Sequence, residues 1–149
     1  MRAVVQRVMR ARVTVDERVT GEIAQGLLVY LGVGAGDEEG DARYLVEKVA
    51  TLRVFEDERG RMSRDVAAVG GALLVVPQFT LYGDVRSGRR PDFTAAKEPA
   101  GANALYERCV ALWRERGLTV ATGEFRAHMR VESVNDGPVT LLVDGARQF

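Results

Sequence analysis

Two continuous apolar runs, at residues 26–33 and 72–79, most constrain how this chain of 149 residues can fold. Both are of strand length, and glycines bound them. A short apolar run without polar alternation is typical of a strand that is covered on both faces. The sequence therefore predicts that residues 26–33 form a central strand and that residues 72–79 form a second core strand.

Two helices and several shorter strands are predicted around these runs. Acidic residues at 37–39 favour a helix N-terminus, and apolar side chains then recur at helical spacing up to Leu52. A second amphipathic segment covers residues 102–116 and ends at Gly117. Residues 82–91 lack periodicity and are predicted as a loop. The shorter predicted strands are residues 3–8, 12–15, 53–55, 61–63, 118–121, 129–134 and 139–143.

The order of these elements predicts the fold class. Strands, a helix, strands, a helix and strands follow one another, with neighbours close enough to form hairpins. This order predicts one α+β domain over residues 1–149, in which mixed or largely antiparallel sheets form a barrel-like core with two flanking helices. Strict β-α-β alternation is absent, which argues against a doubly wound nucleotide-binding fold.

Charge and composition narrow the functional classes. The 21 basic and 21 acidic residues cancel, which argues against DNA or long RNA as a partner and leaves contact with a short RNA end open. No apolar run is long enough to cross a membrane, and the first residues lack a signal-peptide pattern. A single cysteine fits a reducing compartment. We therefore expect a cytoplasmic protein without a membrane partner.

The reactive side chains are few. One histidine, His128, and one cysteine, Cys109, cannot make a Cys/His zinc site, and no phosphate-binding or G-x-S-x-G motif occurs. His128 is interpreted as a structural or surface residue, and Cys109 as an inert thiol on the apolar face of the second helix. We therefore expect no metal and no cofactor, and little use of acid–base side chains.

Four segments carry a family resemblance. The opening MRAVVQRV, the segment VVPQFTL at residues 75–81, RRPDF at residues 89–93 and NDGPVT at residues 135–140 resemble motifs of D-aminoacyl-tRNA deacylases, and the resemblance runs over nearly the whole chain. It implies hydrolysis of the ester that joins a D-amino acid to the terminal ribose of tRNA. Glycyl esters, such as glycine mischarged on tRNA-Ala, are a further implied substrate.

The resemblance also implies a homodimer whose active site is shared between subunits. Gly137 and Pro138, joined by a cis peptide bond in the family, reach from one subunit into the pocket of the other. Their carbonyl groups then face one side and capture the substrate ammonium group. Such backbone contacts reject an L-side chain sterically without contacting a D-side chain.

One position departs from the family pattern. Pro77 stands where the family usually has serine, so a serine nucleophile is excluded there. Because proline cannot donate to a sheet ladder, Pro77 is predicted to mark the end of its strand or an unpaired edge.

The three residues that directly follow Pro77 are the candidate catalytic residues. Gln78 is predicted to orient the substrate or the attacking water, although a solvated strand residue is the alternative. The N–H group of Phe79 or of Thr80 is a candidate oxyanion donor. The Thr80 hydroxyl is either a positioning group or a nucleophile, and no activating base is visible nearby in the sequence. Because no side chain is available as an acid or a base, we expect the vicinal ribose hydroxyl of the substrate to help activate the water or to share the proton.

The remaining candidates follow from the resemblance. Phe125 and Met129 are expected to line the pocket of the terminal adenine, with core packing as the alternative. Arg7 is expected to support the Gly-Pro segment. The loop residues that are expected to contact acceptor-stem phosphates, unless they are merely solvated, are Arg86, Arg89 and Arg90.

Two other functions stay open at this stage. One is a non-catalytic protein of the same fold that binds an RNA end, with Pro77 as the sign of lost activity. The other is a sister deacylase of different chirality preference with a trans Gly-Pro bond.

Overall fold

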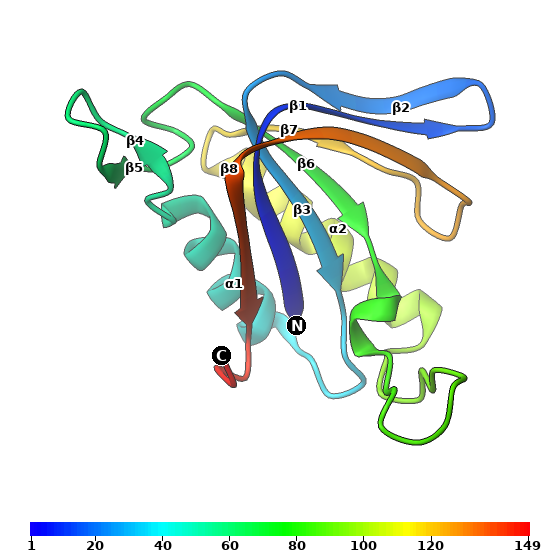
Figure 1. Cartoon of the computed structure of the whole chain (residues 1–149). Helices are drawn as coiled ribbons and strands as arrows, with labels where there is room; N and C mark the ends of the chain where they lie inside the picture. The colour runs from blue at the N-terminus through cyan, green and yellow to red at the C-terminus, as the bar shows by residue number, and fades with distance from the viewer.

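The computed structural model describes residues 1–149, and it places a curved six-stranded sheet against two α-helices. Both helices cover the same face of the sheet, behind it in Figure 1, and the two termini lie at one end of the molecule. This arrangement confirms the predicted α+β class. The strands are β1 (Arg2–Val15), β2 (Arg18–Ile23), β3 (Gly26–Gly32), β4 (Phe55–Glu56), β5 (Met62–Arg64), β6 (Ala72–Pro77), β7 (Thr119–Thr122) and β8 (Arg130–Asp144); the helices are α1 (Glu39–Thr51), α2 (Pro99–Glu115) and the 3-10 helix η1 (Phe79–Tyr82).

The sheet is mixed. Its order is β2-β1-β3-β6-β7, and β8 also pairs with β1. β1 is antiparallel to β2, β3 and β8, whereas β6 is parallel to β3 and β7. β4 and β5 form a separate short hairpin. Neither α1 nor α2 combines the length and the apolar character that a membrane-crossing helix needs.

Two apolar clusters explain why β3 and β6 show no polar alternation. In β3, Leu27, Val29 and Leu31 face a core between the sheet and the helices. The intervening Leu28 faces a second core inside the curved part of the sheet, together with Leu74 of β6. Both faces of these strands are therefore buried, as the sequence predicted for residues 26–33.

The sheet curls until its outer strands nearly meet. A Cβ atom on Gly21 of β2 would lie 2.4 Å from the carbonyl oxygen of Thr122 of β7, so glycine permits the close approach of the two strands. This contact gives the barrel-like core that the sequence predicted.

In two places, two short strands that were predicted separately form one long strand. Residues 3–8 and 12–15 belong to the 14-residue β1. The predicted strands at residues 129–134 and 139–143 fall, apart from Met129, in the 15-residue β8. The prediction was wrong because the two strands pair over nearly their whole length. Bulges near Val8 absorb the interruptions that the sequence pattern suggested as breaks.

Strand β2 was not predicted, and two element boundaries also differ from the prediction. β6 ends at Pro77, and η1 takes up the residues that were assigned to the strand end. α2 begins at Pro99 instead of residue 102, because proline suits the first helical position and Glu98 accepts a hydrogen bond from the N–H of Gly101 at 2.7 Å.

Candidate active site

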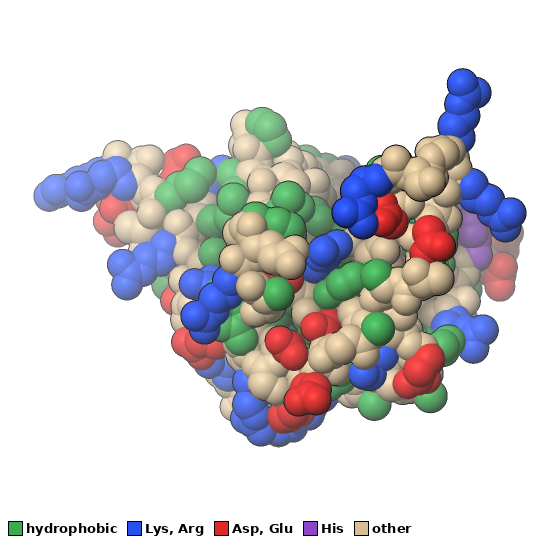
Figure 2. All heavy atoms as spheres, turned by 90° about the horizontal axis from the view of Figure 1, so that it is seen from below, with side chains coloured by type: hydrophobic (Ala, Val, Ile, Leu, Met, Phe, Trp, Pro, Cys, Tyr) green, Lys and Arg blue, Asp and Glu red, His purple; other side chains and the backbone are tan.

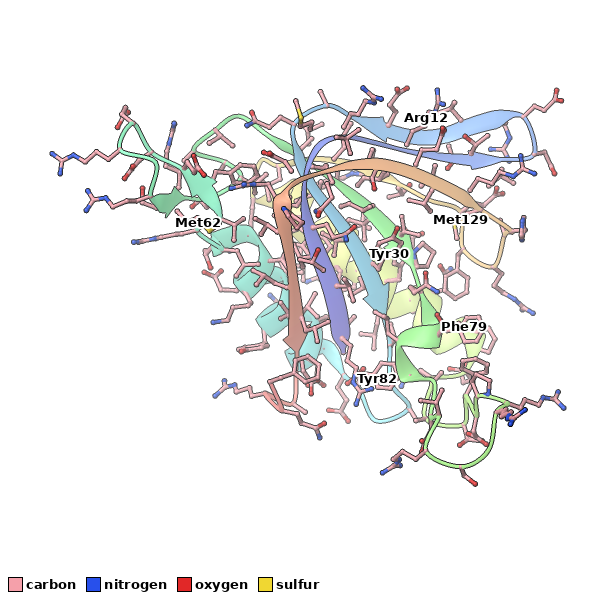
Figure 3. All side chains as sticks on the ribbon, in the orientation of Figure 1. Arg12, Tyr30, Met62, Phe79, Tyr82 and Met129 are labelled. Carbon is pink, nitrogen blue, oxygen red and sulfur yellow. The ribbon has the colours of Figure 1, made fainter.

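A cavity of about 670 Å³ opens at the carboxyl end of β6, bordered by the start of α2 and by the loop before β8. Gln78, Phe79, Phe125 and Met129 line it, and most of the other lining residues are apolar. In Figure 3, Phe79 and Met129 lie on the same side of the molecule, Met129 above and Phe79 below. A mostly apolar hollow of this size with a few polar groups is typical of a ligand site.

Pro77 directs the chain into this cavity. β7 pairs with β6 only as far as Val75, so the missing N–H of Pro77 leaves no gap in the sheet. The N–H of Gln78 donates to the carbonyl of Leu31 at 2.8 Å, and η1 then begins at Phe79. Pro77 therefore marks the end of its strand, as predicted. The N–H groups of Phe79 and Thr80 follow in the first turn of η1, where amides have no partner within the helix.

The first residues of β1 hold η1 in place. Arg2 Nη1 donates to the carbonyl of Leu81 at 3.1 Å, and the Arg2 guanidinium lies 4.6 Å from the centre of the Tyr82 ring. The Tyr82 hydroxyl donates to Asp37 Oδ2 at 3.2 Å. Since these contacts come from other parts of the fold, the backbone of η1 is positioned before any substrate binds.

The Thr80 hydroxyl is paired with Gln78. It accepts a hydrogen bond from the Gln78 side-chain amide, and Thr80 is exposed outside the cavity wall. An amide cannot remove a proton from a hydroxyl, so this contact does not activate Thr80 as a nucleophile. The geometry favours the positioning role over the nucleophilic one.

Phe125 and Met129 are half-buried, and each contacts both the cavity and the protein interior. The Phe125 ring lies 6.3 Å from the ring of Tyr106, and Met129 packs against the core inside the curved sheet. The Met129 sulfur also accepts the N–H of Glu124 at 3.4 Å. Both residues therefore pack against the core and also line the cavity, and their contact with the terminal adenine stays a prediction.

The cavity wall contains ionisable residues that sequence reasoning did not select. Lys97 Nζ donates to the carbonyls of Ala35 and Asp37, at 3.3 and 3.2 Å, and the carboxylate of Glu98 caps α2. Burial raises the pKa of the Tyr106 hydroxyl, which donates to the carbonyl of Val75 at 2.9 Å and stays protonated. Each of these three groups is thus occupied by the fold, and none serves as a free base.

The two other reactive side chains differ in position. His128 is a surface residue, as one of the two interpretations had it, but it also lies at the cavity wall, which was not predicted. Cys109 is buried on α2, and burial raises the pKa of its thiol to about 12, so it is an inert thiol as predicted. No three His, Cys, Asp or Glu side chains gather as a potential metal site.

Gly137 and Pro138 form the tip of a bulge in β8. Gln6 pairs with Thr140 and Val8 with Asn135, so residues 136–139 stand opposite the single residue Arg7. Gly137 has a φ of +130°, which an L-residue rarely adopts. The bond between Gly137 and Pro138 is cis, and both residues are exposed.

The side chains of Arg7 and Asn135 hold the base of this bulge through hydrogen bonds to backbone carbonyls. The buried Arg7 guanidinium donates to the carbonyl of Asp136 at 3.1 Å and to that of Val54 at 2.6 Å. The Asn135 side chain donates to the carbonyls of Arg7 and Val139, at 3.1 and 3.0 Å. Arg7 therefore contacts the Gly-Pro segment directly, as expected.

The bulge does not reach the cavity of its own chain. At the Gly-Pro bulge, β1 and β3 lie between β8 and β6, so three strand spacings, about 14 Å, separate residues 136–139 from β6 along the sheet. Only the other end of β8, at Val131, lines the cavity. Figure 1 shows the bend of β8 on the far side of the sheet from η1. Gln78 and Phe79 are thus brought together with Phe125 and Met129, whereas Arg7, Gly137 and Pro138 form a separate group.

The three loop arginines are not equivalent. Arg86 forms a salt bridge of 2.5 Å with Asp84, and hydrogen bonds from Arg86 lower the pKa of Asp84 to about 2. Arg89 and Arg90 are exposed and form no salt bridge. In Figure 2, acidic and basic side chains are interspersed on the visible face, and no extended field of one sign covers it.

Known proteins are similar in sequence to this chain over nearly its whole length. The sequence profile described as "D-Tyr-tRNA(Tyr) deacylase" matches residues 4–144. The chain is 61% identical to the D-aminoacyl-tRNA deacylase of Heliobacterium modesticaldum, over 97% of each chain, and 60% identical to that of Anaeromyxobacter dehalogenans over the whole of both chains. This chain belongs to the D-aminoacyl-tRNA deacylase family. Membership confirms the resemblance seen in the sequence motifs and makes the protein a hydrolase.

Solved structures agree with the fold of a D-aminoacyl-tRNA deacylase. A structure titled "c-Myc DNA Unwinding Element Binding Protein" is 38% identical, has a TM-score of 0.91 and covers 97% of this chain and 98% of its own. A second, titled as a probable eukaryotic D-amino acid tRNA deacylase, has a TM-score of 0.85 over 96% of this chain and 98% of its own. At 18% identity the second likeness concerns the fold alone.

Proposed function

We propose that this protein hydrolyses the ester bond of D-aminoacyl-tRNA in the cavity at the end of β6, through backbone groups of η1 and without a metal or a cofactor. The observation that carries this proposal is the pairing of an apolar cavity with a fixed backbone turn at Phe79 and Thr80. Lys97, Glu98 and Tyr106 are already engaged by the fold, which leaves the exposed His128 as the one possible side-chain base at the cavity wall. Such a site favours electrostatic stabilisation over acid–base catalysis.

The terminal adenosine of the tRNA fits the apolar part of the cavity. Phe125 offers a flat ring and Met129 a polarisable sulfur, both suited to a nucleobase. The ester carbonyl then lies at η1, where the N–H of Phe79 or Thr80 stabilises the oxyanion that forms when water attacks. Gln78 orients the substrate or the water, and the vicinal ribose hydroxyl takes part in the proton transfer.

A second copy of the chain completes the site. Because Gly137 and Pro138 are exposed and lie three strands away from their own cavity, we infer that they enter the cavity of a partner subunit. There their carbonyls hold the substrate ammonium group and exclude an L-side chain. Glycyl-tRNA has no side chain to exclude, so the same carbonyl groups bind its ammonium group and it is also a substrate.

The balance of charge supports a short RNA end as the partner. A net charge of zero is unlike that of proteins that cover long duplex DNA, whose affinity depends on many phosphate contacts. A protein that acts on aminoacyl-tRNA is expected in the cytoplasm, and the single cysteine, Cys109, supports a reducing compartment.

A comparison of D- and L-aminoacyl-tRNA as substrates tests the proposed function. Purified protein is expected to release D-tyrosine from D-Tyr-tRNA far above the buffer background and to leave L-Tyr-tRNA at that background. The measurement is the decay of radiolabelled aminoacyl-tRNA, in matched samples with and without EDTA. Equal decay of both substrates would indicate a sister deacylase, decay of neither would indicate a non-catalytic RNA-binding protein, and loss of activity in EDTA would contradict a metal-free reaction.

Arg89 and Arg90 are expected to contact tRNA phosphates, whereas Arg86 is already neutralised by Asp84. The double variant Arg89→Ala/Arg90→Ala should weaken tRNA binding and reduce the slope of log affinity against log salt by about 1 to 2, because each phosphate contact contributes about 0.9. Arg86→Ala is the matched control and should leave the slope unchanged. An unaltered slope in the double variant would remove both arginines from the tRNA surface.

A further inference from the structure

Two aromatic rings meet at the mouth of the cavity. The centres of Phe79 and Phe93 lie 5.1 Å apart, with their planes at 70° to each other. Both residues line the cavity, yet Phe79 is 58% exposed and Phe93 is 37% exposed. Exposed apolar side chains that lie together, unlike singly scattered ones, often mark a place that a ligand or partner covers.

The fold holds the second ring in this exposed position. Asp84 and Asp92 exchange two backbone hydrogen bonds, of 2.7 and 2.9 Å, which close the loop of residues 85–91 and fix the place where Phe93 leaves it. A Cβ atom on Gly83 would lie 3.0 Å from the Phe93 ring, so the absence of a side chain there gives the ring its space. The pair is therefore a built feature of the cavity mouth.

The loop that leads to Phe93 also carries positive charge. Arg89 and Arg90 precede Phe93 by four and three residues and form no ion pair. An aromatic surface next to unpaired arginines is the combination that binds single-stranded nucleic acid, since bases stack on the rings while phosphates meet the cations.

We propose that Phe79 and Phe93 form a stacking platform for the nucleotide that precedes the terminal adenosine of the tRNA. The inference rests on the proposed function, which places the terminal adenosine inside the cavity against Phe125 and Met129. The next nucleotide along the single-stranded end then leaves through the cavity mouth, where the two rings lie, and its phosphate passes toward Arg89 and Arg90. Recognition is by stacking, and it tolerates any base.

The test compares a short and a long substrate. D-Tyr-adenosine lacks the preceding nucleotide, whereas a D-tyrosylated minihelix with a single-stranded end carries it. Phe93→Leu, which keeps an apolar side chain without a flat ring, should lower the ratio of kcat/KM for the minihelix to kcat/KM for D-Tyr-adenosine by about tenfold, the equivalent of one stacked base. Phe93→Trp should keep the wild-type ratio.

A matched control and a direct probe exclude a structural effect. Val85→Ala removes another exposed apolar side chain of the same loop, 69% exposed and outside the cavity, and should leave the ratio unchanged. In a minihelix with 2-aminopurine at the penultimate position, binding to the wild-type protein should quench fluorescence, and Phe93→Leu should restore it.

The outcomes separate the two proposals. If the wild-type protein hydrolyses neither substrate, the proposed function fails. If it hydrolyses both, but Phe93→Leu leaves the ratio and the quenching as in the wild type, the stacking platform is wrong while the function stands. An equal loss on both substrates would also overturn the platform, because the ring would then act on the terminal nucleotide.

Discussion

Phe79→Pro is expected to lower kcat about 100- to 1000-fold more than Phe79→Ala does. The alanine variant removes the aromatic ring and keeps the backbone N–H, whereas the proline variant removes both. Loss of one oxyanion donor costs about 2.7–4 kcal/mol of transition-state stabilisation, and this cost gives the expected difference. Proline fits position 79 because it is the first residue of η1, and Gln78 before it has a φ of −144° and a ψ of 81°, outside the α region that a following proline disfavours.

Hydrolysis of D-Tyr-tRNA by both variants under single-turnover conditions measures this difference. Thermal unfolding of the two variants is the control, since a shared midpoint shows that the backbone change left the domain intact. Equal kcat values would mean that the N–H of Phe79 does not stabilise the oxyanion, and Thr80 would then be the remaining donor to test.

Mixed dimers are expected to recover the activity that two defective variants lack. Phe79→Pro disables the η1 part of the site. Gly137→Ala disables the chiral filter, because the new Cβ atom would lie 2.9 Å from Val139 and 3.1 Å from Arg7, in a backbone conformation that disfavours alanine. Misplacement of the substrate by such a shift is expected to lower kcat about 100-fold. If each site combines η1 of one subunit with the Gly-Pro segment of the other, a dimer of the two variants contains one intact site.

Different affinity tags on the two chains allow the mixed dimer to be isolated. Its kcat per dimer should be about half that of the wild type, because one of the two symmetry-related sites is intact. Mixed dimers of each variant with the wild-type chain give the reference values. Activity that stays at the level of the separate variants would place the complete site within one chain, and a monomeric wild-type protein would exclude the shared site altogether.

Periodicity alone predicted the parts of the fold that bury apolar surface. The run at residues 26–33 was assigned correctly because Leu27, Leu28 and Val29 are buried on both faces of the sheet. Both α-helices were also found, since their apolar faces repeat at helical spacing. The long strands β1 and β8 were missed because bulges interrupt the local pattern while pairing with the partner strand continues. Such tertiary pairing leaves little signal within a single segment.

The part of the candidate site that lies within a recognisable sequence motif could be predicted. Gln78 and Phe79 could be named from the sequence because they follow the apolar strand directly. Lys97, Tyr106 and His128 were missed, since they reach the cavity wall from α2 and from two loops, and only folding brings them together. Phe93 was visible within the RRPDF motif, but its exposure beside Phe79 depends on the closure of the loop between Asp84 and Asp92.

The bulge at Gly137 and Pro138 has a consequence for the accuracy of the reaction. Its two ends are fixed by ladder pairs, Val8 with Asn135 and Gln6 with Thr140, and the Asn135 side chain ties its base to the neighbouring backbone. A segment held at both ends in this way is expected to loosen only when the pairing of β1 with β8, the longest in the sheet, opens. If Gly137 and Pro138 select the chirality of the substrate as proposed, warming the protein should therefore reduce the discrimination between D- and L-aminoacyl-tRNA only when this pairing begins to open.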